Sequence, residues 1–116
     1  MHFASIVLSL FVAVAASFSA MGKLRKDPKI VAMMTHVGVS SAQLPILAYL
    51  ELLGALGLLI GLKVHPLGVL SAVALALYFV GAVIAHVRKN DKVADFAPAV
   101  FLALVSAVTA YTISKL

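Results

Sequence analysis

Four long apolar segments, separated by short loops, make up most of this 116-residue chain. They run from about Phe3 to Met21, Leu44 to Leu62, Pro66 to Val87 and Phe96 to Ile113. A helix needs about 20 apolar residues to cross the ~30 Å hydrocarbon core of a bilayer. Only 11% of the residues are charged, against about 25% in a soluble domain, so a water-soluble fold could not cover its apolar surface. The sequence therefore predicts an all-α integral membrane four-helix bundle, formed by residues 1–116 as a single domain.

The first apolar segment is followed, rather than preceded, by basic residues. A cleavable signal peptide has the opposite order, with a basic region before its apolar core. We therefore expect the first segment to remain as a membrane-spanning helix.

Basic residues are concentrated in two loops on one side of the predicted bundle. These loops, 22–43 and 88–95, contain Lys23, Arg25, Lys26, Lys29, Arg88, Lys89 and Lys92, whereas the other side has Lys63 and Lys115. Cytoplasmic loops of membrane proteins carry an excess of Lys and Arg. We therefore expect a multi-pass protein of the cell (plasma) membrane with both loops in the cytoplasm and both termini outside. The positive charge reflects this topology, and no nucleic-acid partner is expected.

The first of these loops contains a helical pattern of its own. Apolar residues recur at Ile30, Met33, Met34 and Val37, which is the spacing of one helix face. We expect a short helix that lies at the cytoplasmic interface of the membrane and ends near Gly38.

Small residues within the spans predict where the helices approach one another. The second span contains Gly54, Gly57 and Gly61, and the third contains Gly81 within a stripe of small residues. Between helices in lipid, apolar side chains gain little by meeting, so close packing through small residues decides association. We expect these four glycines to lie at helix contacts.

Glu51 is the one charged residue between Ile46 and Leu62. A carboxylate at this depth is costly and normally faces protein or water rather than lipid. It lies within about 60° of Gly54 on the helical wheel, so it should point into the bundle. Two interpretations follow: Glu51 handles protons or binds a polar headgroup, or it is hydrogen-bonded between helices as a structural lock.

Two further polar residues, Tyr78 and His86, lie on the third span in the same half of the membrane as Glu51. Together the three would form a small ligand-binding site. The alternative for His86 is an interaction with the last carbonyl groups of its own helix.

Redox and catalytic motifs are absent from the sequence. Without cysteine the chain has no thiolate metal site, attached c-type haem or dithiol centre. No HExxH, GxSxG, Walker or dinucleotide-binding motif occurs, and the surroundings of His36 and His86 do not differ from ordinary helix core in a way that indicates haem. We expect no catalytic residue, no metal and no haem.

Three sequence stretches, in this order, resemble the DoxX-like family of small four-helix membrane proteins. They are "GKLRKDPKIVAMMTHVGVSSAQLPILAYLE", "ELLGALGLLIGL" and "ALYFVGAVIAHVRKND". Glu51, Gly54, Gly57, Gly61 and His86 are the positions that match the family pattern. Some relatives are membrane subunits associated with thiosulfate–quinone oxidoreduction, and others accompany oxidative-stress enzymes in a membrane assembly. The resemblance thus implies contact with a quinone, or a scaffold role.

We therefore expect a membrane subunit or scaffold that binds a lipid or quinone headgroup near Glu51 and His86, without catalysis of its own. Its partners would be the lipid bilayer and a larger membrane protein complex or further copies of the chain. The alternative is a subunit of a quinone-linked oxidoreductase of the thiosulfate–quinone type, in which Glu51 is the proton-handling carboxylate. A transporter is disfavoured, because the two halves of the chain share only small-residue character and Glu51 has no counterpart.

Overall fold

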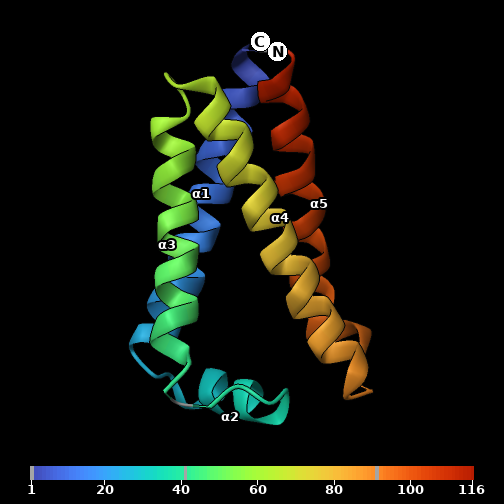
Figure 1. The fold of residues 1–116 in the computed structure, drawn as a ribbon. Helices are drawn as coiled ribbons and strands as arrows, with labels where there is room; N and C mark the ends of the chain where they lie inside the picture. Colours follow the sequence, from blue (N-terminus) through green and yellow to red (C-terminus); the bar gives the residue numbers. More distant parts are fainter. Residues whose placement is uncertain (1, 41, 91) are drawn as a thin grey trace.

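The computed structural model describes residues 2–40, 42–90 and 92–116. Within these ranges the chain forms five helices and no strand: α1 (His2–Leu24), α2 (Pro28–His36), α3 (Leu44–Ile60), α4 (His65–Arg88) and α5 (Val93–Ser114). The expectation of an all-helical membrane bundle is confirmed. Both termini lie at one end of the bundle, and α2 lies across the opposite end (Figure 1).

Among the described residues, three helical segments are long and apolar enough to span a bilayer, namely His2–Leu24, His65–Arg88 and Phe96–Ser114. The predicted second span is shorter than expected. Helix α3 has 17 residues, or about 26 Å at 1.5 Å per residue, which is near the short end of the spanning range. It ends at Ile60 because residues 61–63 form the turn into α4.

The four long helices pack as two pairs. The most extensive contacts join α1 to α3 and α4 to α5, and smaller contacts of α3 with α4 and α1 with α5 connect the pairs. The buried core contains Val12, Ala16, Leu58, Ala72 and Leu75, among others. Helices α3 and α4 lie close together near the termini and separate toward α2 (Figure 1).

Glycine permits the close approach of α3 and α4. A Cβ atom at Gly61 would collide with the backbone of Gly68, whose nitrogen would be 2.6 Å away. At Gly57 it would collide with the Ser71 side chain, and at Gly54 it would lie 2.6 Å from a Leu75 methyl group. These three glycines thus lie at helix contacts.

Gly81 differs from the other three glycines. A Cβ there would meet no atom within 4 Å among the described residues, so no helix contact depends on this glycine. The reason is geometric: Gly81 lines a cavity rather than a helix contact.

Helix α2 begins and ends at residues suited to those positions. The carboxylate of Asp27 accepts a hydrogen bond from the Lys29 amide at 3.0 Å, and Pro28 occupies the first turn, where a missing N–H is harmless. The helix ends at His36, and Gly38 follows in the left-handed region with φ 91°. The expected short helix is therefore present.

Candidate functional site

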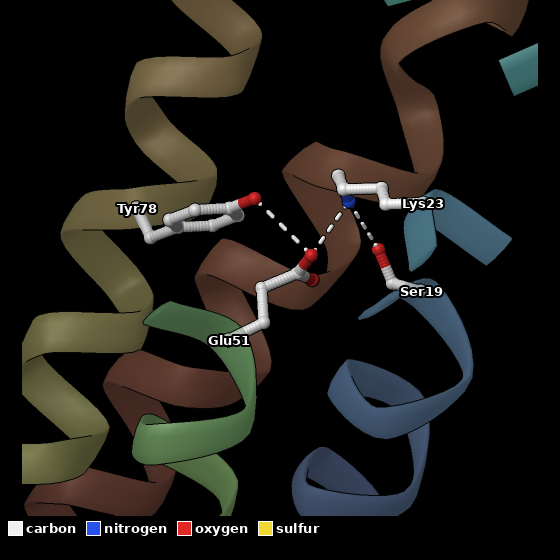
Figure 2. Close-up of polar contacts among 4 residues, drawn as sticks. All are labelled: Ser19, Lys23, Glu51 and Tyr78. Atoms are coloured by element: carbon white, nitrogen blue, oxygen red, sulfur yellow. Dashed lines mark hydrogen bonds and ion pairs between the residues drawn. The ribbon is translucent and has the colours of Figure 1, made fainter. Parts of the chain in front are cut away.

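A network of buried polar side chains joins three helices inside the bundle. Glu51 on α3 is fully buried, and its Oε1 lies 2.5 Å from the Nζ atom of Lys23 on α1. The hydroxyl of Tyr78 on α4 donates to the same oxygen at 3.1 Å. Figure 2 shows both side chains directed at the Glu51 carboxylate. The two helix pairs are thus bridged through one carboxylate oxygen.

Lys23 belongs to this network, although the sequence interpretation did not include it. The sequence pattern places Lys23 in the basic loop, whereas in the structure it lies in the last turn of α1 and is only 7% exposed. Its Nζ atom also donates to Ser19 Oγ at 2.8 Å, one turn earlier on the same helix. A buried carboxylate needs a cation or several hydrogen bonds to offset its desolvation. The first basic residue after the first span was the nearest candidate, and this is the signal that could have identified it.

Glu51 and Tyr78 occupy a regular position in the seam between α3 and α4. Going from the termini toward α2, the contacts across this seam are Gly61 with Gly68, Gly57 with Ser71, Gly54 with Leu75, and Glu51 with Tyr78. Each step advances three or four residues on both helices. The next step would pair Leu47 with Ala82, and both of these residues line a cavity. The Glu51–Tyr78 hydrogen bond therefore lies at the boundary between the contact of α3 with α4 and the cavity.

The cavity has a volume of about 440 Å³ and is bordered by all five helices. This lies within the range of about 300–1,000 Å³ that is usual for small-molecule sites. Its polar lining residues are Ser19, Lys23, Tyr78 and His86; the others are Met33, Met34, Val37, Val39, Leu47, Phe79, Gly81, Ala82, Ala85, Pro98, Ala99 and Leu102. The composition, mainly apolar with a few convergent polar groups, is typical of a binding site for an amphipathic molecule.

The structure brings together two of the three predicted ligand-binding residues. Glu51 contacts Tyr78, but Glu51 does not line the cavity, whereas Lys23 does. His86 is buried and lines the cavity, eight residues after Tyr78 and therefore roughly 12 Å closer to α2. Its ring centroid is 6.5 Å from that of Phe96. Glu51 is thus bonded to Lys23 and Tyr78 rather than to His86.

Two atoms of the network, Nζ of Lys23 and Oε2 of Glu51, can each form a further hydrogen bond. Lys23 has three N–H donors, and two of them are used by Ser19 and Glu51; the ammonium also lies 5.9 Å from the centroid of the Tyr78 ring. The second carboxylate oxygen of Glu51, Oε2, is buried and has no hydrogen-bond partner within the described part of the chain. The network can therefore donate to a ligand through Lys23 and accept a proton or donor at Glu51.

No metal centre is formed by the described residues, which contain no group of three or more His, Asp or Glu side chains suited to an ion. His36 lies at the end of α2 and is exposed, and it is not among the residues that line the cavity with His86.

The sequence profile of the DoxX-like family matches residues 7–108. The matched range contains Lys23, Glu51, Tyr78 and His86 and all of α2, α3 and α4. Searches of curated proteins and of solved structures found no match.

Proposed function

The chain belongs to the DoxX-like family, and we propose that it is a multi-pass membrane subunit or scaffold whose cavity binds the polar headgroup of a lipid or quinone. The observation that carries this proposal is the position of Lys23. This ammonium is almost fully buried, lines an apolar cavity and has one N–H group beyond those used by Ser19 and Glu51. A hydrogen-bond acceptor in the cavity would complete its coordination.

The charge balance of the network favours a neutral acceptor. The positive charge of Lys23 is already matched by Glu51 at 2.5 Å, so a ligand with a net negative charge would bring an uncompensated charge into an apolar site, which is costly. A carbonyl oxygen, as in a quinone or an acyl ester, satisfies the remaining N–H group without this cost. Tyr78 would lie beside this oxygen, and His86 would contact the part of the ligand nearer α2.

This proposal gives the three predicted residues different roles. Tyr78 and His86 line the cavity and would contact the ligand. Glu51 would act through Lys23, by holding the ammonium at the cavity wall. The polar contact to the headgroup comes from Lys23.

A binding titration with two short-chain probes tests the proposal. The probes are 2,3-dimethoxy-5-methyl-1,4-benzoquinone and dihexanoyl phosphatidylcholine, added to the purified protein in detergent micelles. The decisive variant is Lys23→Met with Glu51→Gln, because it removes the ammonium and leaves no unpaired charge. The expected result is that wild type binds one of the probes and the double variant binds it at least about tenfold more weakly, a loss of about 1.4 kcal/mol.

The control is Lys29→Met, which removes an exposed positive charge at the start of α2. It should bind like wild type. Equal binding by wild type and the double variant, or no binding of either probe by wild type, would overturn the proposal.

A second candidate function rests on the unpartnered oxygen of Glu51. Reduction of a quinone to a quinol takes up two electrons and two protons. The Oε2 atom of Glu51 is buried and belongs to the side chain that bonds Tyr78, so it could hold one of those protons. The chain would then be a subunit of a quinone-linked oxidoreductase, with the electrons supplied by a partner enzyme from a donor such as thiosulfate. Optical spectra of the natively purified complex, with added quinone and thiosulfate, test this role. Quinone reduction that is slowed by Glu51→Gln supports it, and absence of any reduction by the wild-type complex eliminates it.

The orientation in a plasma membrane is also a proposal. The end of the bundle that carries α2 contains the exposed basic residues Arg25, Lys26, Lys29, Arg88, Lys89 and Lys92, whereas Lys63 and Lys115 lie at the other end. The excess of positive charge supports placing the α2 end in the cytoplasm and both termini outside. The cavity would then lie in the cytoplasmic half of the membrane.

A further inference from the structure

A second hollow lies outside the bundle, along the seam between α3 and α4. It has a volume of about 350 Å³ and is lined by Leu50, Leu53, Gly54, Leu70, Ser71, Ala74, Leu75 and Tyr78. Leu50, Leu53 and Leu70 are each more than half exposed, so this groove faces the lipid. It extends along α4 from Leu70 to Tyr78, which are eight positions apart, or roughly 12 Å.

Tyr78 forms part of both the outer groove and the inner cavity. Its hydroxyl donates a hydrogen bond to Glu51 on α3, so the side chain extends from α4 toward α3 (Figure 2). On the α2 side of Tyr78, the seam positions Leu47 and Ala82 line the cavity. A chain leaving the cavity between these two residues would reach the groove by passing the edge of Tyr78.

The inner cavity is too small for a whole membrane lipid. At about 440 Å³ it is near the lower end of the range for drug-sized ligands, about 300–1,000 Å³. A headgroup and the first part of a chain would fill it, and the rest of the chain must lie elsewhere. The outer groove is apolar, faces the membrane and shares a wall residue with the cavity.

We propose that the ligand is a bilayer molecule with a long hydrocarbon tail, that its headgroup occupies the cavity, and that its tail leaves beside Tyr78 to lie in the groove between α3 and α4. This inference rests on the proposed headgroup-binding function. A tail fits the groove better than a helix of a partner protein does. A helix is about 10–12 Å across, whereas the seam closes at the contact between Gly61 and Gly68.

The test compares a short-tailed and a long-tailed ligand on a variant with a filled groove. Ala74 is exposed and lines only the groove, so Ala74→Phe occupies the path of the tail and leaves the cavity wall unchanged. The probes are 2,3-dimethoxy-5-methyl-1,4-benzoquinone and its 6-decyl homologue, or dihexanoyl and didecanoyl phosphatidylcholine if the lipid probe is the one that binds. The expected result is that Ala74→Phe weakens the long-tailed probe about tenfold, because several methylene groups lose their burial, and leaves the short-tailed probe unchanged.

The matched control is Val73→Phe, which adds the same ring to the neighbouring exposed position of α4 outside both hollows. It should affect neither probe. If the short-tailed probe binds wild type but Ala74→Phe weakens neither probe, or both equally, the inference is overturned while the headgroup proposal stands. If the short-tailed probe does not bind wild type, the headgroup proposal itself fails.

A second measurement does not depend on a substitution. A long-tailed probe with a photoreactive diazirine at the end of its tail should crosslink to the groove residues Leu50, Leu53, Leu70 or Ala74. Crosslinks confined to α5, or to α2 at the end of the bundle, would contradict the proposed path.

Discussion

The Nζ atom of Lys23 lies 2.5 Å from Oε1 of Glu51, across a separation of 28 residues in the sequence. The carboxylate is fully buried and the lysine nearly so. Both residues come from the helix pair formed by α1 and α3, and Tyr78 on α4 connects this ion pair to the other helix pair. The three residues thus connect the two helix pairs, and two of them, Lys23 and Tyr78, also line the cavity.

Removing one charge of this pair should be far more costly than removing the hydrogen bond from Tyr78. Glu51→Gln leaves the Lys23 ammonium buried without a counter-charge, with an expected cost of about 3–5 kcal/mol. Tyr78→Phe removes one hydrogen bond to the carboxylate, with an expected cost of about 1–3 kcal/mol. The free energy of unfolding in mixed micelles measures both. Equal and small effects of the two substitutions would show that the ion pair does not contribute in this way.

A methyl group at Gly61 should disrupt the seam between α3 and α4. The Cβ of Gly61→Ala would collide with the backbone of Gly68, which cannot move aside as a flexible side chain can, and overpacking of this kind costs about 1–3 kcal/mol. Gly81→Ala is the matched control. It adds the same methyl group where no described atom lies within 4 Å, and alanine favours helix by up to about 1 kcal/mol over glycine. Melting temperatures should fall for Gly61→Ala and be unchanged or higher for Gly81→Ala.

Filling the cavity should weaken ligand binding without unfolding the bundle. Gly81 lines the cavity and has open space around it, so Gly81→Leu should place its side chain where the ligand lies. We expect the affinity for the short-chain probe to fall by about tenfold or more, or by at least about 1.4 kcal/mol. Val80→Leu, on the neighbouring lipid-exposed position, should bind like wild type. Unaltered binding by Gly81→Leu would place the ligand outside this cavity.

The proposed orientation can be measured directly because the chain contains no cysteine. Lys26 lies in the loop between α1 and α2, and Lys63 lies in the loop between α3 and α4. These loops are at opposite ends of the bundle (Figure 1), so each position is suited to a single-cysteine variant. A membrane-impermeant maleimide added to intact cells should label position 63 and leave position 26 protected until the cells are opened. Labelling of position 26 in intact cells, with protection of position 63, would reverse the topology.

The helices and the glycine contacts were predictable because they depend on local sequence. The length of the apolar segments predicts the long helices, and the apolar spacing from Ile30 to Val37 predicts α2. The spacing of Gly54, Gly57 and Gly61 also marked the face that meets α4. Each of these features is determined by the periodicity of one helix.

The composition of the site was less predictable, because it depends on how the helices cross. Lys23 lies next to other basic residues, and the excess of positive charge suggested a solvated loop rather than an ion pair with Glu51. The separation of α4 from α3 also could not be predicted from the sequence. In the structure Gly81 and His86 line the cavity, and His86 is not bonded to Glu51.

A charge swap tests most directly whether the buried pair is a ligand site or only a lock between helices. Lys23→Glu with Glu51→Lys keeps an ion pair between α1 and α3, but it moves the ammonium from the cavity wall to the position behind it. Affinity for the short-chain probe and the free energy of unfolding should be measured on the same samples. Our account predicts that the swap recovers stability relative to Glu51→Gln alone but binds the probe at least about tenfold more weakly than wild type. Recovery of stability together with wild-type affinity would contradict it and leave Lys23 and Glu51 as a structural lock.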